Sequence, residues 1–398
     1  MMIFEGKNGN QLYLKTLKYI LQNGKQTNPR GLLTKELYPA LTKIELPQER
    51  FLSCYGRNIN PFFLTAEALW ILAGKGDVEW ISYYNSKLKE YDDGSPNFHG
   101  AYGMRLRRYG TFKDNTHMLW RGYGEIDQFK SVINKLKKDK YTRQAVMCLW
   151  NPFFDNSPSK DYPCNNLTYL KIRNNKLHLH QILRSNDVNL GLYPTNVFQW
   201  SMVQEYLASA LGLKMGHLLF YSDSLHCYLN PETRKLAKQV LKTHRPRRQR
   251  YVTLRNVRES NVTLGVRDSN VYDVYAYLHP CSMVTAELEV LDSNLHGILE
   301  NIEEYKQGNF DISLSNSNNP LLESIELMLK IYSLRKHNRI LESIENTHYI
   351  PALDFRVMAY QYAYNKAKND TKDRDWIIHF CKLEKLHGKL IHFIKHGG

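Results

Sequence analysis

The chain has 398 residues, of which 42% are hydrophobic and 12% aromatic, so it can bury a core and is not a disordered polymer. Its N-terminal residues lack the apolar segment of a signal peptide, and no stretch approaches the roughly 18 apolar residues of a membrane span. Six scattered cysteines without a Cys-x-x-Cys pair argue against a disulfide framework or a zinc ribbon. We therefore expect a soluble cytoplasmic protein.

The formal net charge of +15 favours a polyanionic partner, such as a nucleotide or a nucleic acid. Much of the positive charge lies in a basic segment, residues 243–258. Such a segment is equally compatible with a solvated surface and supports nucleic-acid binding only weakly.

Apolar residues recur at helical spacing over residues 10–24 and 62–74, and each segment ends at a glycine. Between residues 141 and 190 the pattern changes to strands, with a turn at Asn174-Asn175 and with His178 and His180 on one face. An apolar helix over 196–213 and a strand-loop segment over 217–229 follow. These elements predict a mixed α/β (α+β) unit around a central sheet.

Segments 286–305, 321–344, 354–368 and 375–394 each have helical periodicity and are separated by polar links. We therefore expect three parts: a catalytic α/β domain over residues 1–240, a basic linker or strand region over 241–282, and an all-helical domain over 283–398. The helical part carries no motif that indicates a chemistry.

One candidate nucleophile, Cys164, follows a proline in "DYPCNNLTYL", where turn residues give way to a strand. A lone cysteine is more often a small buried hydrophobe than a reactive group. The polar residues spaced around it change that balance, since arginines favour a thiolate. The ordered set comprises Arg30, Glu67, Tyr102, Arg143, Cys164, Arg184, Ser185, Asp187, Asn196, His226 and Tyr228.

This ordered set resembles the thymidylate synthase family, which includes the pyrimidine nucleotide hydroxymethylases of phages. The resemblance runs from about residue 11 to residue 230. Its motifs are an Arg-Gly loop at 30, Glu-x-x-Trp-x-x-x-Gly from 67, Gly-x-Tyr-Gly from 100, Arg-Gln at 143, Pro-Cys at 163, Arg-Ser-x-Asp from 184, an Asn at 196 and His-x-Tyr from 226. It implies a thymidylate-synthase-like sheet with flanking helices, to which the C-terminal helices are an addition.

The resemblance implies that a Cys164 thiolate adds to C6 of a pyrimidine, so that C5 attacks the one-carbon unit of 5,10-methylenetetrahydrofolate. Arg184 would lower the pKa of this thiol, and Glu67 would assist proton movement at C4 and C5. By the same resemblance, Arg30, Arg184 and Ser185 bind the phosphate, Asn196 the base edge, His226 and Tyr228 the sugar hydroxyl, and Asp187 and Tyr102 the folate. Arg143 would reach across from a second subunit, which implies a homodimer with two composite sites. We expect no metal, because the mechanism needs none and the histidines lack ligand spacing.

Two features bear on the substrate. The amide of Asn196 can donate and accept, which suits a uracil edge, whereas a carboxylate would suit cytosine. Asn196 therefore favours dUMP over dCMP, although "LGLYPTN" is one residue longer than the usual family spacing and Thr195 is the alternative occupant. Whether the sugar is ribose or deoxyribose stays open.

Three departures from the family bear on the product. Asn165 replaces the usual histidine after the nucleophile, Leu88 and Tyr91 stand where the family carries tryptophans, and its short apolar C-terminal tail is not recognisable. Hydride transfer needs a closed, dry site, so these departures favour water capture and a 5-hydroxymethyl-dUMP product. The alternatives are thymidylate synthase, dCMP hydroxymethylase, and a non-catalytic nucleotide- or RNA-binding relative. A phage enzyme of this kind would act in the host cytoplasm.

Overall fold

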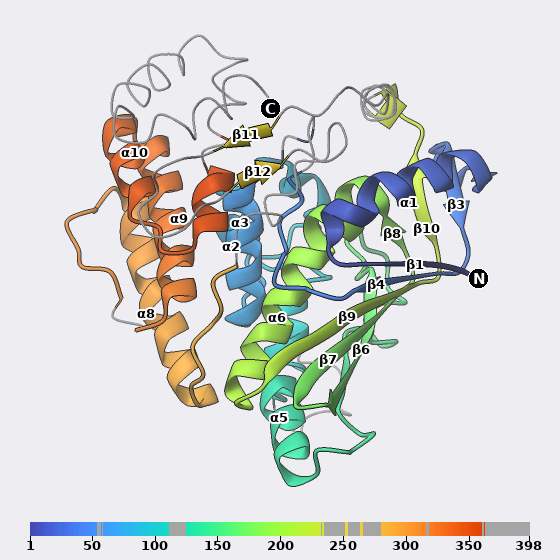
Figure 1. Ribbon diagram of the computed structural model, residues 1–398, viewed down its shortest axis with the longest axis horizontal. Coiled ribbons are helices and arrows are strands. Elements are labelled where there is room, and N and C mark those ends of the chain that lie inside the picture. Colours follow the sequence, from blue (N-terminus) through green and yellow to red (C-terminus); the bar gives the residue numbers. More distant parts are fainter. Residues whose placement is uncertain are drawn as a thin grey trace.

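A six-stranded mixed sheet with helices packed on one of its faces organises the α/β part of the computed structural model (Figure 1). The structure describes residues 1–53, 57, 59–110, 125–231, 233–234, 280–315, 318–359 and 362, and the backbone of 251–253 and 263–265. The strand order is β1 (Met2–Gly6), β4 (Ala40–Ile44), β9 (Lys214–Ser222), β7 (Lys176–Leu183), β6 (Asn165–Arg173) and β5 (Val146–Cys148). β1 runs parallel to β4 and β7 runs parallel to β9, and the remaining pairs are antiparallel.

The β6–β7 hairpin forms where the sequence predicts it. Asn174 and Asn175 connect the strands with φ of 52° and 56°. Positive φ at both central residues is typical of the hairpin turn that matches strand twist, and asparagine tolerates it well. His178 and His180 lie half-buried on one face of β7, as expected.

A smaller sheet places several candidate residues. It pairs β2 (Lys25–Thr27), β3 (Thr34–Leu37), β10 (Leu225–Tyr228) and β8 (Asn186–Asp187), in that order. β10 is antiparallel to β3 and parallel to β8, so this sheet joins the start of the chain to segments near residues 186 and 226. A separate short pair consists of β11 (Tyr251–Thr253) and β12 (Thr263–Gly265).

The predicted helices form with clear end signals. The side chain of Asn8 accepts the N–H of Gln11 at the start of α1 (Gly9–Asn23), and Asn60 accepts two N–H groups at the start of α2 (Pro61–Leu72). After α2 the chain reverses at Gly74, whose φ is +71°. The other short helices of this part are α3 (Val78–Ser82), α4 (Tyr102–Arg107), α5 (Gln128–Lys138), and the irregular turns η1 (Pro29–Gly31), η2 (Ser86–Tyr91) and η4 (Val188–Asn196).

The central helix, α6 (Val197–Ala210), is buried over its whole length. It packs on β7 and β9 on one side and contacts α2 on another, so it is covered on all sides, as its apolar sequence predicts. On the opposite face of the large sheet, alternate side chains such as those of Ile3 and His180 stay partly exposed.

The C-terminal helices are α8 (Leu288–Gln307), α9 (Pro320–Lys336) and α10 (Ile340–His348), followed by a helical segment over 353–359. The segment over 321–344 is helical, as expected, and is divided between α9 and α10 by a turn at which Asn338 has φ of 59°. α9 packs against α2, and Phe355 packs edge-on against Phe51 with ring centroids 4.9 Å apart. The helices therefore share a core with the α/β part, and the three-part division of the chain stays a prediction.

Two further predictions concern segments outside the described residues. The basic segment 243–258 and the helix expected over 375–394 lie outside them, apart from the backbone of 251–253. Among the helices in the described part of the chain, none has both the length and the apolar character that a membrane span requires.

Candidate active site

Cys164 and Arg184 lie together at the ends of two adjacent strands. Cys164 precedes β6 and Arg184 follows β7, and the backbone N–H of Arg184 donates to the Cys164 carbonyl at 3.1 Å. The Arg184 guanidinium donates to the carbonyls of Pro163 and Tyr162, both at 3.0 Å. Its Nη2 atom is also 3.7 Å from the Sγ of Cys164. One side chain therefore holds the Pro-Cys segment and touches its thiol.

Burial is the largest influence on the Cys164 thiol and raises its pKa. Arg184 opposes this shift, Asp161 adds to it, and Arg30 opposes it. The two arginines lower the pKa of this thiol, as expected from the sequence. The net pKa of Cys164 is nevertheless raised, which the sequence did not predict. The reason is that desolvation disfavours the thiolate more than the two cations favour it.

Arg30 approaches the site from the opposite end of the sequence. It is exposed in η1 between β2 and β3, with φ of 55° and ψ of 32°. This left-handed conformation is uncommon for a residue other than glycine and is often found at functional positions. The small sheet carries this loop toward the β8–β10 segments, which explains why the charge of Arg30 acts on Cys164.

Glu67, on α2, supplies an unusual carboxyl. Its Oε2 atom is buried and, among the described residues, has no hydrogen-bond partner. Burial raises the pKa of Glu67 to about 7, a Gln199 hydrogen bond opposes the shift, and the charge of Asp161 adds to it. A carboxyl with this pKa can both accept and release a proton near neutral pH.

A chain of amides follows the candidate nucleophile, Cys164. Asn165 is fully buried, and its Nδ2 atom donates to Oδ1 of Asn196 at 3.4 Å. The Nδ2 atom of Asn196 donates in turn to Oδ1 of Asn186 at 3.0 Å. Tyr102, on α4, hydrogen-bonds Asn165, and burial followed by the charge of Cys164 raises the pKa of its phenol. The structure therefore brings Tyr102, Cys164 and Asn196 into one site, with Asn165 as the link.

The extra residue of the "LGLYPTN" segment is absorbed locally. Residues 188–196 form an irregular π-helical segment, a geometry that accommodates an additional residue and occurs often at functional sites. Thr195 turns its hydroxyl back onto the Leu190 carbonyl at 2.7 Å, whereas Asn196 joins the amide chain beside Cys164. The geometry thus favours Asn196 over Thr195 as the residue that faces the site.

Asp187 caps this segment. Its Oδ1 accepts the N–H groups of Asn189 at 2.7 Å and Leu190 at 2.6 Å. Burial raises the pKa of Asp187, and the neighbouring His226 opposes this shift. Ser185 lies half-buried between Arg184 and β8.

His226 and Tyr228 project from the same face of β10. The His226 side chain is 6% exposed, and its ring meets that of Tyr228 edge-on at 5.1 Å. Because β10 pairs with both β3 and β8, these two residues lie beside Asp187.

Arg143 is the exception among the candidates. It is exposed in the bend before β5, the edge strand of the large sheet, and no interaction within the described residues joins it to Cys164. Leu88 and Tyr91 stand at the positions where the family carries tryptophans. Leu88 is partly buried in η2, and Tyr91 is 51% exposed.

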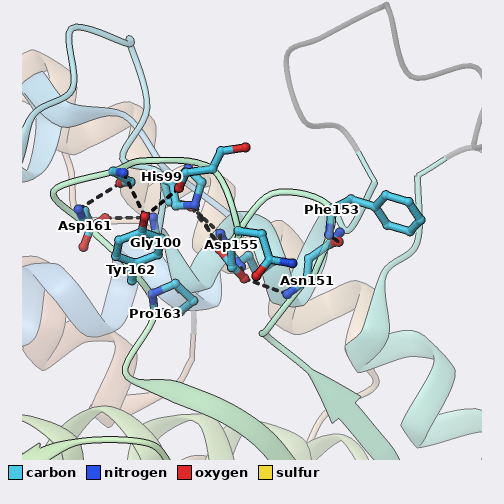
Figure 2. A network of polar contacts seen from close by, with 12 residues as sticks. His99, Gly100, Asn151, Phe153, Asp155, Asp161, Tyr162 and Pro163 are labelled. Carbon is cyan, nitrogen blue, oxygen red and sulfur yellow. Dashed lines mark hydrogen bonds and ion pairs between the residues drawn. The ribbon is translucent and has the colours of Figure 1, made fainter.

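One network of polar contacts was not predicted from the sequence (Figure 2). The guanidinium of Arg105 donates two hydrogen bonds, of 2.7 and 2.8 Å, to the carboxylate of Asp155. The Nε2 atom of His99 lies 2.9 Å from an oxygen of the same carboxylate. The carboxylate of Asp161 accepts the N–H of Gly100 at 2.8 Å. This network ties the loop at residues 99–100 to the segment that leads into Cys164. The available signals were the His-Gly before Ala-Tyr-Gly and the acid three residues before the nucleophile, and neither indicates its partner.

Comparisons with known proteins identify the family of the chain. Residues 11–290 match the family model described as thymidylate synthase. The chain is 38% identical over 246 residues to the deoxyuridylate hydroxymethyltransferase of Bacillus phage SP01, covering 61% of this chain and 63% of that protein. It is 32% identical over 192 residues to the protein of the same name from Pseudomonas phage M6, covering 48% and 51%. A putative thymidylate synthase of Methanosarcina mazei is 29% identical over 229 residues, covering 57% of this chain and 89% of that protein.

The matches thus span between half and just under two thirds of the length of the two phage relatives. The family model covers well over half of this chain and includes every candidate residue from Arg30 to Tyr228. The chain belongs to the thymidylate synthase family.

Proposed function

We propose that this chain transfers a one-carbon unit to C5 of a pyrimidine nucleotide, with dUMP as substrate and 5-hydroxymethyl-dUMP as product. The observation that carries this proposal is the Cys164 thiol in contact with Arg184. The buried carboxyl of Glu67 supports it, because the charge of Asp161 acts on both Glu67 and Cys164. The names of the two phage relatives, both deoxyuridylate hydroxymethyltransferases, support the same reaction.

In this proposal 5,10-methylenetetrahydrofolate supplies the one-carbon unit. The Cys164 thiolate adds to C6 of the base, which makes C5 nucleophilic toward that unit. Glu67 moves protons at C4 and C5, a task that suits a carboxyl whose pKa is about 7. Loss of the C5 proton and departure of tetrahydrofolate then leave an exocyclic methylene on C5. Water adds to this methylene and gives up a proton, and re-formation of the C5–C6 double bond expels the thiolate.

The nucleotide would be held by groups already close together. Arg30, Arg184 and Ser185 are the proposed phosphate ligands, since guanidinium groups match phosphate oxygens well. Asn196 would read the base edge, and His226 and Tyr228 would meet the sugar. Asp187 and Tyr102 would contact the folate. The carboxylate of Asp187 can accept hydrogen bonds from the N–H groups of the folate.

We also propose a symmetric homodimer. The large sheet keeps partly exposed apolar side chains on the face away from α6, among them Ile3, Ile182 and Tyr221. A second copy on this face would bury them, and Arg143, on the edge of the same sheet, could then reach the partner's phosphate site. Sedimentation velocity at low micromolar concentration tests this, and a monomer that remains active would refute it.

The side chains of Leu88 and Tyr91 in η2 support hydroxymethylation rather than methylation. Leu88 and the half-exposed Tyr91 offer less apolar cover than tryptophans would, so water can reach the intermediate. Methylation to dTMP is the second candidate, because the Methanosarcina mazei relative is named a putative thymidylate synthase and is matched over 89% of its length.

Mass spectrometry of the products separates these candidates. The protein is incubated with dUMP, and separately with dCMP, in the presence of 5,10-methylenetetrahydrofolate, with Cys164→Ala as control. We expect a hydroxymethyl group on dUMP that the variant does not produce. A methyl group with dihydrofolate formed would favour thymidylate synthase, and no product from either nucleotide would favour a binding role.

A further inference from the structure

Three polar side chains form a row across the small sheet. Glu36 on β3 is the cross-strand partner of His226 on β10, and His226 is in turn paired with Asp187 on β8. Directly paired residues project on the same face of a sheet. Leu225 and Cys227, which alternate with His226, are fully buried. Glu36, His226 and Asp187 therefore lie on one face, and Glu36 has no role in the function proposed above.

Hydrogen bonds around Ser224 determine which nitrogen of His226 carries the proton. The hydroxyl of Ser224 donates to the Glu36 carboxylate. The Nδ1 atom of His226 lies 3.4 Å from this hydroxyl oxygen and 3.4 Å from the Ser224 carbonyl oxygen. A carbonyl can only accept, and the hydroxyl has already given its one proton to Glu36. Both contacts therefore require a proton on Nδ1.

We propose that Glu36 is a positioning residue that acts through Ser224 to hold His226 as the Nδ1–H tautomer. The Nε2 atom then carries a lone pair, and no described residue donates a hydrogen bond to it. It can accept a hydrogen bond from a ligand hydroxyl, but it cannot bind a group that only accepts, such as a phosphate oxygen. That the hydroxyl belongs to the nucleotide sugar rests on the proposed function.

Asp187 is the competing partner for the imidazole. Its Oδ1 accepts the backbone N–H groups of Asn189 and Leu190, and no hydrogen bond within the described residues joins it to His226. One oxygen of Asp187 is thus occupied by two backbone donors rather than by a proton from Nε2. The test must distinguish three states of the ring, the two neutral tautomers and the imidazolium.

NMR of ¹⁵N-histidine-labelled full-length protein makes this distinction, with the His226 signals assigned by their loss in His226→Gln. We expect a protonated Nδ1 and an unprotonated Nε2 at pH 7.5. Glu36→Leu should shift the ring toward the Nε2–H tautomer that free imidazoles favour. Glu36→Gln should give an intermediate shift, because an amide can donate to Ser224 as well as accept from it. Glu79→Gln, an exposed glutamate of α3, is the control and should change nothing.

A wild-type signal with Nε2 protonated, or an imidazolium at this pH, would overturn the proposal. So would an unchanged tautomer in Glu36→Gln, the variant that best preserves the shape of the side chain.

Ligand binding gives a second readout. The wild type should bind dUMP about five- to tenfold more tightly than 2′,3′-dideoxyuridine monophosphate, the usual effect of one hydrogen bond. Glu36→Leu should reduce this ratio toward one while leaving the affinity for the dideoxy analogue unchanged. Equal loss of affinity for both nucleotides would indicate a general structural role and would count against the proposal. If the wild type binds neither nucleotide, the proposed function fails, and the NMR measurement alone decides the role of Glu36.

Discussion

The Nη2 atom of Arg184 lies 3.7 Å from the Sγ of Cys164 while donating a 3.0 Å hydrogen bond to the Tyr162 carbonyl. One guanidinium thus fixes the loop that presents the thiol and lowers the pKa of that thiol against the effect of burial. Position and reactivity of the proposed nucleophile depend on the same side chain.

Replacing Arg184 with Gln should therefore affect both. The pKa of Cys164 rises further, so its alkylation by iodoacetamide requires a higher pH, and Cys164→Ala identifies the reacting thiol. Turnover should fall by about 10²-fold, because displacement by about 1 Å has that cost. Arg173→Gln, at the far end of the β6–β7 hairpin, serves as the control. An unchanged alkylation profile would show that Arg184 does not tune the thiol.

Glu67→Gln should change how stability depends on pH. The pKa of Glu67 is about 7 in the folded protein and near 4.5 when unfolded, so the folded state binds the proton more tightly. The wild type then loses up to about 3 kcal/mol of unfolding free energy as pH rises from 4.5 to 7. The amide variant lacks this loss and should be relatively more stable at pH 8, although inactive. Urea unfolding at pH 5 and 8 measures the difference, and parallel behaviour of the two proteins would contradict the buried carboxyl.

Asn196→Asp should change the choice of base. A carboxylate accepts from the amino group of cytosine but offers the uracil edge no donor, so the ratio of turnover with dUMP to that with dCMP should fall by about 10²-fold or more. Thr195→Ala is the matched control and should leave the ratio unchanged, since the Thr195 hydroxyl bonds Leu190. If Thr195→Ala alters base choice and Asn196→Asp does not, the register assigned to this segment is wrong.

Gly100→Ala should lower the stability of the protein by disturbing the segment before Cys164. A Cβ on Gly100 would lie 2.9 Å from the backbone oxygen of Asp161 and about as close to its carboxylate. Neither can move without disturbing the segment before Cys164, so we expect a loss of about 1–3 kcal/mol. Gly297→Ala, inside α8, meets only an ordinary 3.5 Å contact and should stabilise by about 0.5–1 kcal/mol. Thermal unfolding compares the two, and equal effects would refute this reading of the close contact.

Three histidines on the uncovered sheet face should make stability fall in acid. Burial, followed by the charges of His178 and His180, lowers the pKa of His217 to about 4. The unfolded chain therefore binds protons at higher pH than the folded one, so stability decreases as pH falls from about 6.5 toward 4. His217→Gln should flatten this decrease, whereas His296→Gln, in an exposed position on α8, should not. Melting temperatures across this range, measured at constant ionic strength, provide the test.

Sequence reasoning succeeded where the determining interactions are local. The Asn174-Asn175 turn and the start of α2 at Asn60 depend on neighbouring residues only, so the chain shows them directly. It missed the stop at Asn338, where a left-handed residue with φ of 59° divides one continuous apolar pattern between two helices.

The sequence by itself indicated the family, the order of the motifs and the candidate thiol, since each rests on residue types at characteristic spacings. Only the tertiary structure decided the electrostatics: the net effect on Cys164, the raised pKa of Glu67, and the network of Asp161 with Gly100. It also joined Asn196 rather than Thr195 to Asn165, the residue after Cys164, and set Glu36 next to His226. The physical reason is that burial and hydrogen bonding depend on which distant segments meet, and linear spacing does not specify that.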